Sequence, residues 1–241
     1  MNRYKASLIH FVCSATVIAI YLAIVYFVWY PEPFFTIETA FGVIIILISV
    51  DVVLGPLLTF IVYKPDKPRL KMDLSIIVAI QLAAFVWGLS ITYSQRPVYV
   101  ALVGEYFSVV AASDIKTSVP EAIVSKKKYI GPTLVYLDLP KGDELVALIE
   151  KARASSRQIN TMTELYQPYE EHIADVARQG VDLYQRAVRY PEVLENLNKF
   201  LTRNAAAYND YIFVPIEGRK HIYFLALNRS DGMIAGFLEN E

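Results

Sequence analysis

The sequence predicts an α+β protein in two parts: three transmembrane helices, followed by an extramembrane α+β domain with an antiparallel sheet and several helices. The 241 residues are 55% hydrophobic, with a mean hydropathy of +0.36, which is too apolar for one ordinary soluble domain. The excess lies before Tyr93, and short apolar runs alternate with turn residues after it. We therefore divide the chain into a membrane domain over residues 1–93 and an α+β domain over residues 94–241.

Three apolar runs are long enough to cross a bilayer. A helix needs about 20 apolar residues to span ~30 Å of hydrocarbon, and the sequence predicts such helices at about residues 8–30, 37–63 and 74–93. The first run exceeds the roughly 7–15 apolar residues of a signal peptide, and no cleavage site of small residues closes it. We therefore expect an uncleaved anchor.

Basic residues at the ends of the spans predict their orientation. Six of them precede the first span or separate the second from the third: Arg3, Lys5, Lys64, Lys67, Arg69 and Lys71. The positive-inside rule places these segments in the cytoplasm. With three spans, the C-terminal domain then lies on the other side, which predicts a multi-pass protein of a bacterial inner membrane with a periplasmic domain.

The α+β domain begins and ends with predicted strands. Alternating β-branched and aromatic residues predict strands at 98–103, 106–111 and 133–139. Turn signals of hairpin length separate three further strands at 211–215, 221–228 and 233–238.

The middle of this domain is predicted to be helical. A helix is expected from near Gly142 to about Ser156, with its apolar residues on one face. Pro168 is expected in the first turn of a helix that runs through Ala177, and Pro191 is expected to open the last helix.

The sequence contains none of the common catalytic or cofactor-binding patterns. It has no G-x-S-x-G elbow, no Walker lysine loop and no G-x-G-x-x-G. Cys13 is the one cysteine, and His10, His172 and His221 lack metal-ligand spacing. The net charge of −1 argues against a nucleic-acid partner. We therefore expect no enzymatic activity, no cofactor and no metal.

Asp51 is the most unusual residue of the membrane domain. Counting about 1.5 Å per residue places it roughly 18 Å deep in the second span, where an ionised side chain costs about 2.5–3.5 kcal/mol on insertion scales. Three explanations are open: a hydrogen bond to another span, through Tyr21 or Gln81; contact with a partner; or proton or ion handling. Gly55 and Pro56 follow in the same helix, where they open it to close approach of a neighbouring backbone.

A basic run at Lys126, Lys127 and Lys128 has two interpretations. It is either a solvated loop or a contact with lipid phosphates at the outer face of the membrane.

Three motifs occur in order along the chain. They are DVVLGPLLT at residues 51–59 with Lys64 after it, QLAA at 81–84, and RPVY at 96–99 followed by EYFSVVAASD at 105–114. With these motifs the chain resembles the type IV pilin accessory proteins of the TfpX/TfpZ family. The layout of three spans and an outer C-terminal domain agrees with that resemblance.

The resemblance implies a chaperone-like accessory factor of the inner membrane that binds a cognate major type IV pilin and promotes pilus assembly. The expected partners are this pilin and the lipid bilayer. The candidate partner-binding residues are Asp51, Gly55, Pro56, Thr59 and Gln81. A membrane-anchored periplasmic sensor and a structural subunit of a membrane complex remain alternatives.

Overall fold

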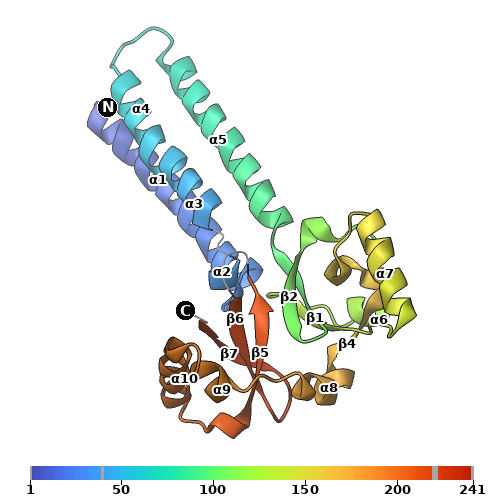
Figure 1. The fold of residues 1–241 in the computed structure, drawn as a ribbon. Helices are drawn as coiled ribbons and strands as arrows, with labels where there is room; N and C mark the ends of the chain where they lie inside the picture. Colours follow the sequence, from blue (N-terminus) through green and yellow to red (C-terminus); the bar gives the residue numbers. More distant parts are fainter. Residues whose placement is uncertain (1, 39–40, 219–221, 240–241) are drawn as a thin grey trace. The chain divides into compact units, whose positions relative to one another are not determined.

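The computed structural model describes residues 2–38, 41–218 and 222–239 (Figure 1). The chain forms two compact units. The first unit comprises Met1–Pro31 and Thr39–Arg96, and the second comprises Glu32–Glu38 and Pro97–Glu241.

The first unit is built from long apolar helices. The helix α1 (Arg3–Ile24) continues into a π-helical stretch (Val25–Trp29), and α5 (Leu70–Ser94) is continuous. Between them, α3 (Phe41–Ile48), a π-helical stretch (Ser49–Leu54) and α4 (Gly55–Val62) follow one another without a break. Among the described residues, three helical segments are long and apolar enough to cross a membrane: Arg3–Trp29, Gly42–Val62 and Leu70–Ser94.

The start of the second span differs from the expectation of residue 37. The short helix α2 (Phe34–Ile37) belongs to the second unit, where the side chain of Ile37 is fully buried in the main apolar cluster. An apolar run does not distinguish burial in a bilayer from burial in a protein core, because both remove the side chain from water. The segment that joins the first two spans is thus part of the folded second unit.

The second unit contains one sheet, and the predicted α+β class is confirmed. Seven strands of the described residues form the sheet in the order β4-β3-β1-β2-β5-β6-β7. They are β1 (Pro97–Val103), β2 (Tyr106–Ala111), β3 (Thr133–Leu137), β4 (Tyr166–Pro168), β5 (Tyr211–Glu217), β6 (Ile222–Asn228) and β7 (Ile234–Glu239). The sheet is mixed, not purely antiparallel as expected, because β1 pairs parallel with β3 and β2 pairs parallel with β5. Both parallel pairs are joined by long connections, as parallel strands require.

Besides α2, the second unit contains five described α-helices, and all but the first of them lie between β3 and β5 in the sequence. They are α6 (Glu121–Val124), α7 (Asp143–Ala154), α8 (Ile173–Arg178), α9 (Leu183–Ala187) and α10 (Pro191–Asn204). The proline at 191 opens α10 as expected. Pro168 ends β4, where it pairs with Val135, and it is also the N-cap of a 3₁₀ turn (Tyr169–His172) that leads directly into α8, so the expected helical stretch follows it. Since β4 is an edge strand, the missing N–H of proline is tolerated there.

Side chains alternate between the two faces of the sheet. One face carries a single apolar cluster to which β1, β2, β3, β5 and β6 all contribute. The opposite face carries two separate clusters, one beneath α9 and α10 and the other around β1, β3 and α6. Among the described residues, two pairs join β2 to β5: Phe107 with Ile216 and Ser108 with Glu217. The sheet therefore consists of two halves that meet at this short junction.

Candidate functional site

Asp51 is buried inside the first unit, within the π-helical stretch that precedes α4. Its side chain is 6% exposed. The Nε2 of Gln81 donates to the backbone oxygen of Asp51 at 3.2 Å and lies 3.4 Å from its Oδ1. Tyr21 has a different partner, since its hydroxyl lies 2.8 Å from Thr92 Oγ1. The structure thus pairs Asp51 with Gln81, which is one of the two internal partners that the sequence suggested.

Gly55 makes room for this pairing. A Cβ atom at residue 55 would lie 2.0 Å from Nε2 of Gln81 and 2.6 Å from its Cδ. Any other residue at this position therefore forces the Gln81 amide to move away from Asp51. The close approach of α4 and α5 depends on the absence of a side chain, as is common between membrane helices.

Pro56 and Thr59 face α1. The Oγ of Ser7 donates to the backbone oxygen of Pro56 at 2.9 Å, and Nδ1 of His10 lies 2.6 Å from Thr59 Oγ1. Pro56 has no N–H to donate to the preceding turn, and the π-helical stretch ends directly before Gly55 and Pro56. The second span therefore has polar contacts on two sides: Gln81 of α5 meets Asp51, and two residues of α1 meet Pro56 and Thr59.

A pocket of about 250 Å³ lies beside Asp51 and Gln81. Its remaining lining residues come from α1 and α5: His10, Cys13, Ser14, Val17, Val78, Leu82 and Phe85. Gln81 is itself buried, and its Oε1 accepts no hydrogen bond from the described residues. The pocket thus combines apolar walls with buried oxygen acceptors, and a hydrogen-bond donor is the complementary group.

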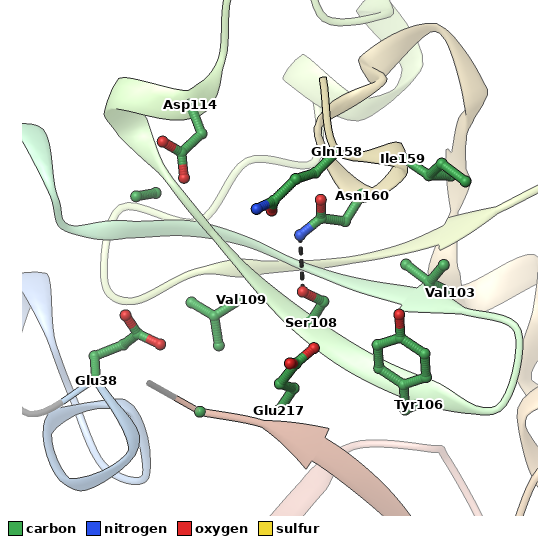
Figure 2. A pocket seen from close by; sticks show the side chains of 12 residues that line it. Glu38, Val103, Tyr106, Ser108, Val109, Asp114, Gln158, Ile159, Asn160 and Glu217 are labelled. Atoms are coloured by element: carbon green, nitrogen blue, oxygen red, sulfur yellow. Dashed lines mark hydrogen bonds between the residues drawn. The ribbon is translucent and has the colours of Figure 1, made fainter. Parts of the chain in front are cut away.

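The second unit has a larger polar pocket of about 530 Å³ (Figure 2). Carboxylates of Glu38, Asp114 and Glu217 line it. Asn160 Nδ2 donates to Ser108 Oγ at 2.7 Å, as the dashed line in Figure 2 shows. No local pattern points to this pocket, because its lining comes from segments far apart in the sequence.

The two histidines that the structure describes, His10 and His172, contact neighbouring side chains. The ring of His172 stacks on Tyr136 with centroids 4.0 Å apart, and its Nδ1 lies 3.3 Å from Asp175 Oδ2. His221 lies outside the described residues. Within the described ranges, no three His, Cys, Asp or Glu side chains are arranged to hold a metal ion.

Comparison with known proteins identifies the family. A family model described as fimbrial assembly protein FimB matches residues 1–38. A fimbrial assembly protein of serogroups C1 and C2 from Dichelobacter nodosus is 41% identical over 114 residues, which are 46% of this chain and 86% of that relative. The chain belongs to the family of fimbrial assembly proteins.

A second fimbrial assembly protein, of serogroup I from the same organism, is 37% identical over 155 residues. The match covers 61% of this chain and 60% of that relative. No solved structure matches the chain. Three apolar helices associate this fimbrial assembly protein with a membrane, which fits a role in fimbrial biogenesis in the cell envelope.

Arg157 holds the segment of this fimbrial assembly protein that carries Asn160. Its Nη2 donates to the backbone oxygen of Thr161 at 3.1 Å, and its guanidinium forms an ion pair with Glu164 at 3.3 Å. Partial burial raises the pKa of Glu164, but a hydrogen bond from its own backbone and the Arg157 guanidinium lower that pKa by more, so it lies below the ordinary value.

Replacing Arg157 with alanine is expected to lower the free energy of unfolding by about 1–2 kcal/mol at neutral pH, because charged hydrogen bonds are lost from a partly exposed site. A carboxyl with a lowered pKa in the folded state stabilises above its ordinary pKa, and this contribution disappears as the pH falls through the lowered value. The difference between wild type and variant should therefore shrink in acid. Chemical denaturation of the purified chain at neutral and acidic pH measures it.

Arg153→Ala is the matched control. Arg153 is exposed on α7 and forms no ion pair with the described carboxylates, so its removal should change the free energy of unfolding by less than about 0.5 kcal/mol. Equal losses for Arg153→Ala and Arg157→Ala would contradict the role of Arg157.

Proposed function

We propose that the chain is a non-enzymatic accessory factor of type IV pilus biogenesis, of the TfpX/TfpZ kind, that binds a cognate major pilin in the inner membrane. The observation that carries this proposal is the pocket beside Asp51, in which buried oxygen acceptors lie between two membrane helices. Membership in the family of fimbrial assembly proteins supports it. In the proposed topology the N-terminus is cytoplasmic and the second unit is periplasmic.

The proposed binding mode uses the walls of the pocket as a groove for a guest helix. A pilin is anchored in the membrane by an apolar helix before it enters the fibre. This helix packs between α1 and α5, and a polar group on it donates a hydrogen bond to Asp51 or to Oε1 of Gln81. Between membrane helices such a bond contributes about 0.6–2 kcal/mol, which holds a subunit without preventing its release.

Site-specific photo-crosslinking in cells tests the groove. Crosslinkers at Val17 and Leu82, which line the pocket on α1 and α5, are expected to capture the pilin. Val12 and Ile80 are exposed apolar residues of the same helices that do not line the pocket, and they serve as controls. Capture at all four positions alike, or at the controls alone, would refute a helix in this groove.

Asp51→Leu is expected to weaken pilin capture about fivefold to thirtyfold, which corresponds to the loss of ~1–2 kcal/mol. Surface piliation should fall with it. Asp51→Asn keeps an acceptor oxygen and the shape of the side chain, so its effect should be smaller. The measurements are crosslinking yield, surface pili and the cellular levels of both proteins. Wild-type capture by Asp51→Leu at a normal protein level would exclude Asp51 as a contact.

A further inference from the structure

The segment between α6 and β3 presents apolar side chains to the surroundings. Tyr129 is 99% exposed and Ile130 is 61% exposed. The base of this segment is fixed, since Ile123 is buried in an apolar cluster and the backbone N–H of Lys128 donates to Thr133 Oγ1 at 3.0 Å. The exposed residues therefore belong to an anchored loop, which holds its apolar tip outward.

Two lysines beside this tip are available to a negatively charged surface. Lys126 is engaged by acidic residues, with its Nζ 3.2 Å from Glu170 Oε2 and 3.7 Å from Glu171 Oε1. Lys127 and Lys128 are exposed and form no ion pair with the described carboxylates. Basic and aromatic side chains next to each other are typical of segments that contact lipid headgroups.

A very short connection joins the last apolar helix of the first unit to the second unit. Only Gln95 and Arg96 separate the end of α5 at Ser94 from the start of β1 at Pro97. At the end of α5, the guanidinium of Arg96 lies 3.6 Å from the ring centroid of Tyr93, and Tyr93 packs edge-on against Trp29. Such aromatic and basic groups are typical of the headgroup level at the end of a membrane helix, and the main stretch of the second unit, Pro97–Glu241, begins directly after them.

We propose that residues 127–130 bind the surface of an anionic lipid bilayer. Tyr129 and Ile130 enter the headgroup region, where an aromatic ring with a polar tip is favoured. Lys127 and Lys128 lie over lipid phosphates as point charges. This contact is independent of the pocket beside Asp51.

Fluorescent labelling of the full-length chain tests the contact. In a Cys13→Ala background, which removes the one native thiol, Tyr129→Cys is labelled with an environment-sensitive fluorophore. The chain is reconstituted into nanodiscs of phosphatidylcholine with or without phosphatidylglycerol. The matched control is Val146→Cys, at an apolar residue of α7 that is 56% exposed in the same unit and follows the acidic residues Asp143 and Glu144. A lipid that carries a quencher at the headgroup reports depth.

The label at residue 129 is expected to be quenched at least about twice as strongly as the label at residue 146, and more so with phosphatidylglycerol. Lys127→Glu with Lys128→Glu should remove the dependence on phosphatidylglycerol. Equal quenching at the two positions would overturn the proposal. Quenching at residue 129 that the double lysine variant leaves unchanged would overturn the part assigned to the lysines. A second readout needs no fluorophore: a water-soluble maleimide should react more slowly with the thiol of Tyr129→Cys than with the thiol of Val146→Cys.

Discussion

Replacing Phe107 with alanine is expected to lower the free energy of unfolding of the second unit by about 3–5 kcal/mol. Phe107 is fully buried in the cluster that spans both halves of the sheet, and it pairs with Ile216 at the two-residue junction of β2 and β5. The loss of the ring leaves a cavity directly beside the two described residue pairs that join β2 to β5. Thermal and chemical unfolding of the purified chain, followed by near-ultraviolet circular dichroism, measures the change.

Tyr106→Ala is the control for Phe107→Ala. Tyr106 precedes Phe107 in the same strand, but its side chain is 42% exposed, so the expected loss is below about 1 kcal/mol. Hydrogen exchange should also separate the two variants: amides of β2 and β5 should lose protection together in Phe107→Ala. A stability loss that is the same for both variants would show that the junction does not hold the halves of the sheet together.

Local patterns in the sequence predicted the elements that depend on local physics. The spans are long apolar runs, and the hairpin strands of residues 211–239 alternate between two clusters as a half-buried strand must. The helix α10 begins at Pro191 because proline suits the first helical turn, and an amphipathic pattern follows it. These features need no knowledge of distant residues.

Features that depend on distant partners were not predictable in the same way. Pro168 caps the helical stretch that was expected after it, but its pairing with Val135 at the end of β4 depends on a distant strand and was not apparent from the local sequence. Ile37 continues an apolar run of the second span, yet its place is in the core of the second unit. The parallel pairing of β2 with β5 joins residues about one hundred positions apart. Over such a separation, local sequence patterns do not indicate which residues pair with each other.

The surroundings of Asp51 were predictable in part. The sequence alone predicts that Asp51 has a partner, because a carboxylate in hydrocarbon requires one whatever the fold. The identity of that partner required the structure: the sequence left Tyr21 and Gln81 as alternatives, and Gln81 is the one that meets Asp51. The fit between Gly55 and the Gln81 amide was not foreseen, because it depends on the rotation of α5 about its axis.

Gly55→Ala is expected to destabilise the first unit by about 1–3 kcal/mol. The added methyl group displaces the Gln81 amide, which then loses both of its contacts with Asp51, and the buried carboxylate remains without a donor. Gly42→Ala is the matched control, because nothing lies within 4 Å of a Cβ at that position and alanine is the better helix former. Unfolding by sodium dodecyl sulfate in bicelles measures both variants.

A double-mutant cycle identifies the cause. In a Gln81→Ala background the methyl group of residue 55 no longer meets an amide, so the added cost of Gly55→Ala should fall below about 0.5 kcal/mol. The interaction energy of the cycle is then on the order of 1–2 kcal/mol, within the range found for residues in contact. An unchanged cost in both backgrounds would mean that Gly55 matters only for the helix itself. In that case Asp51 would not depend on the close approach of α4 and α5.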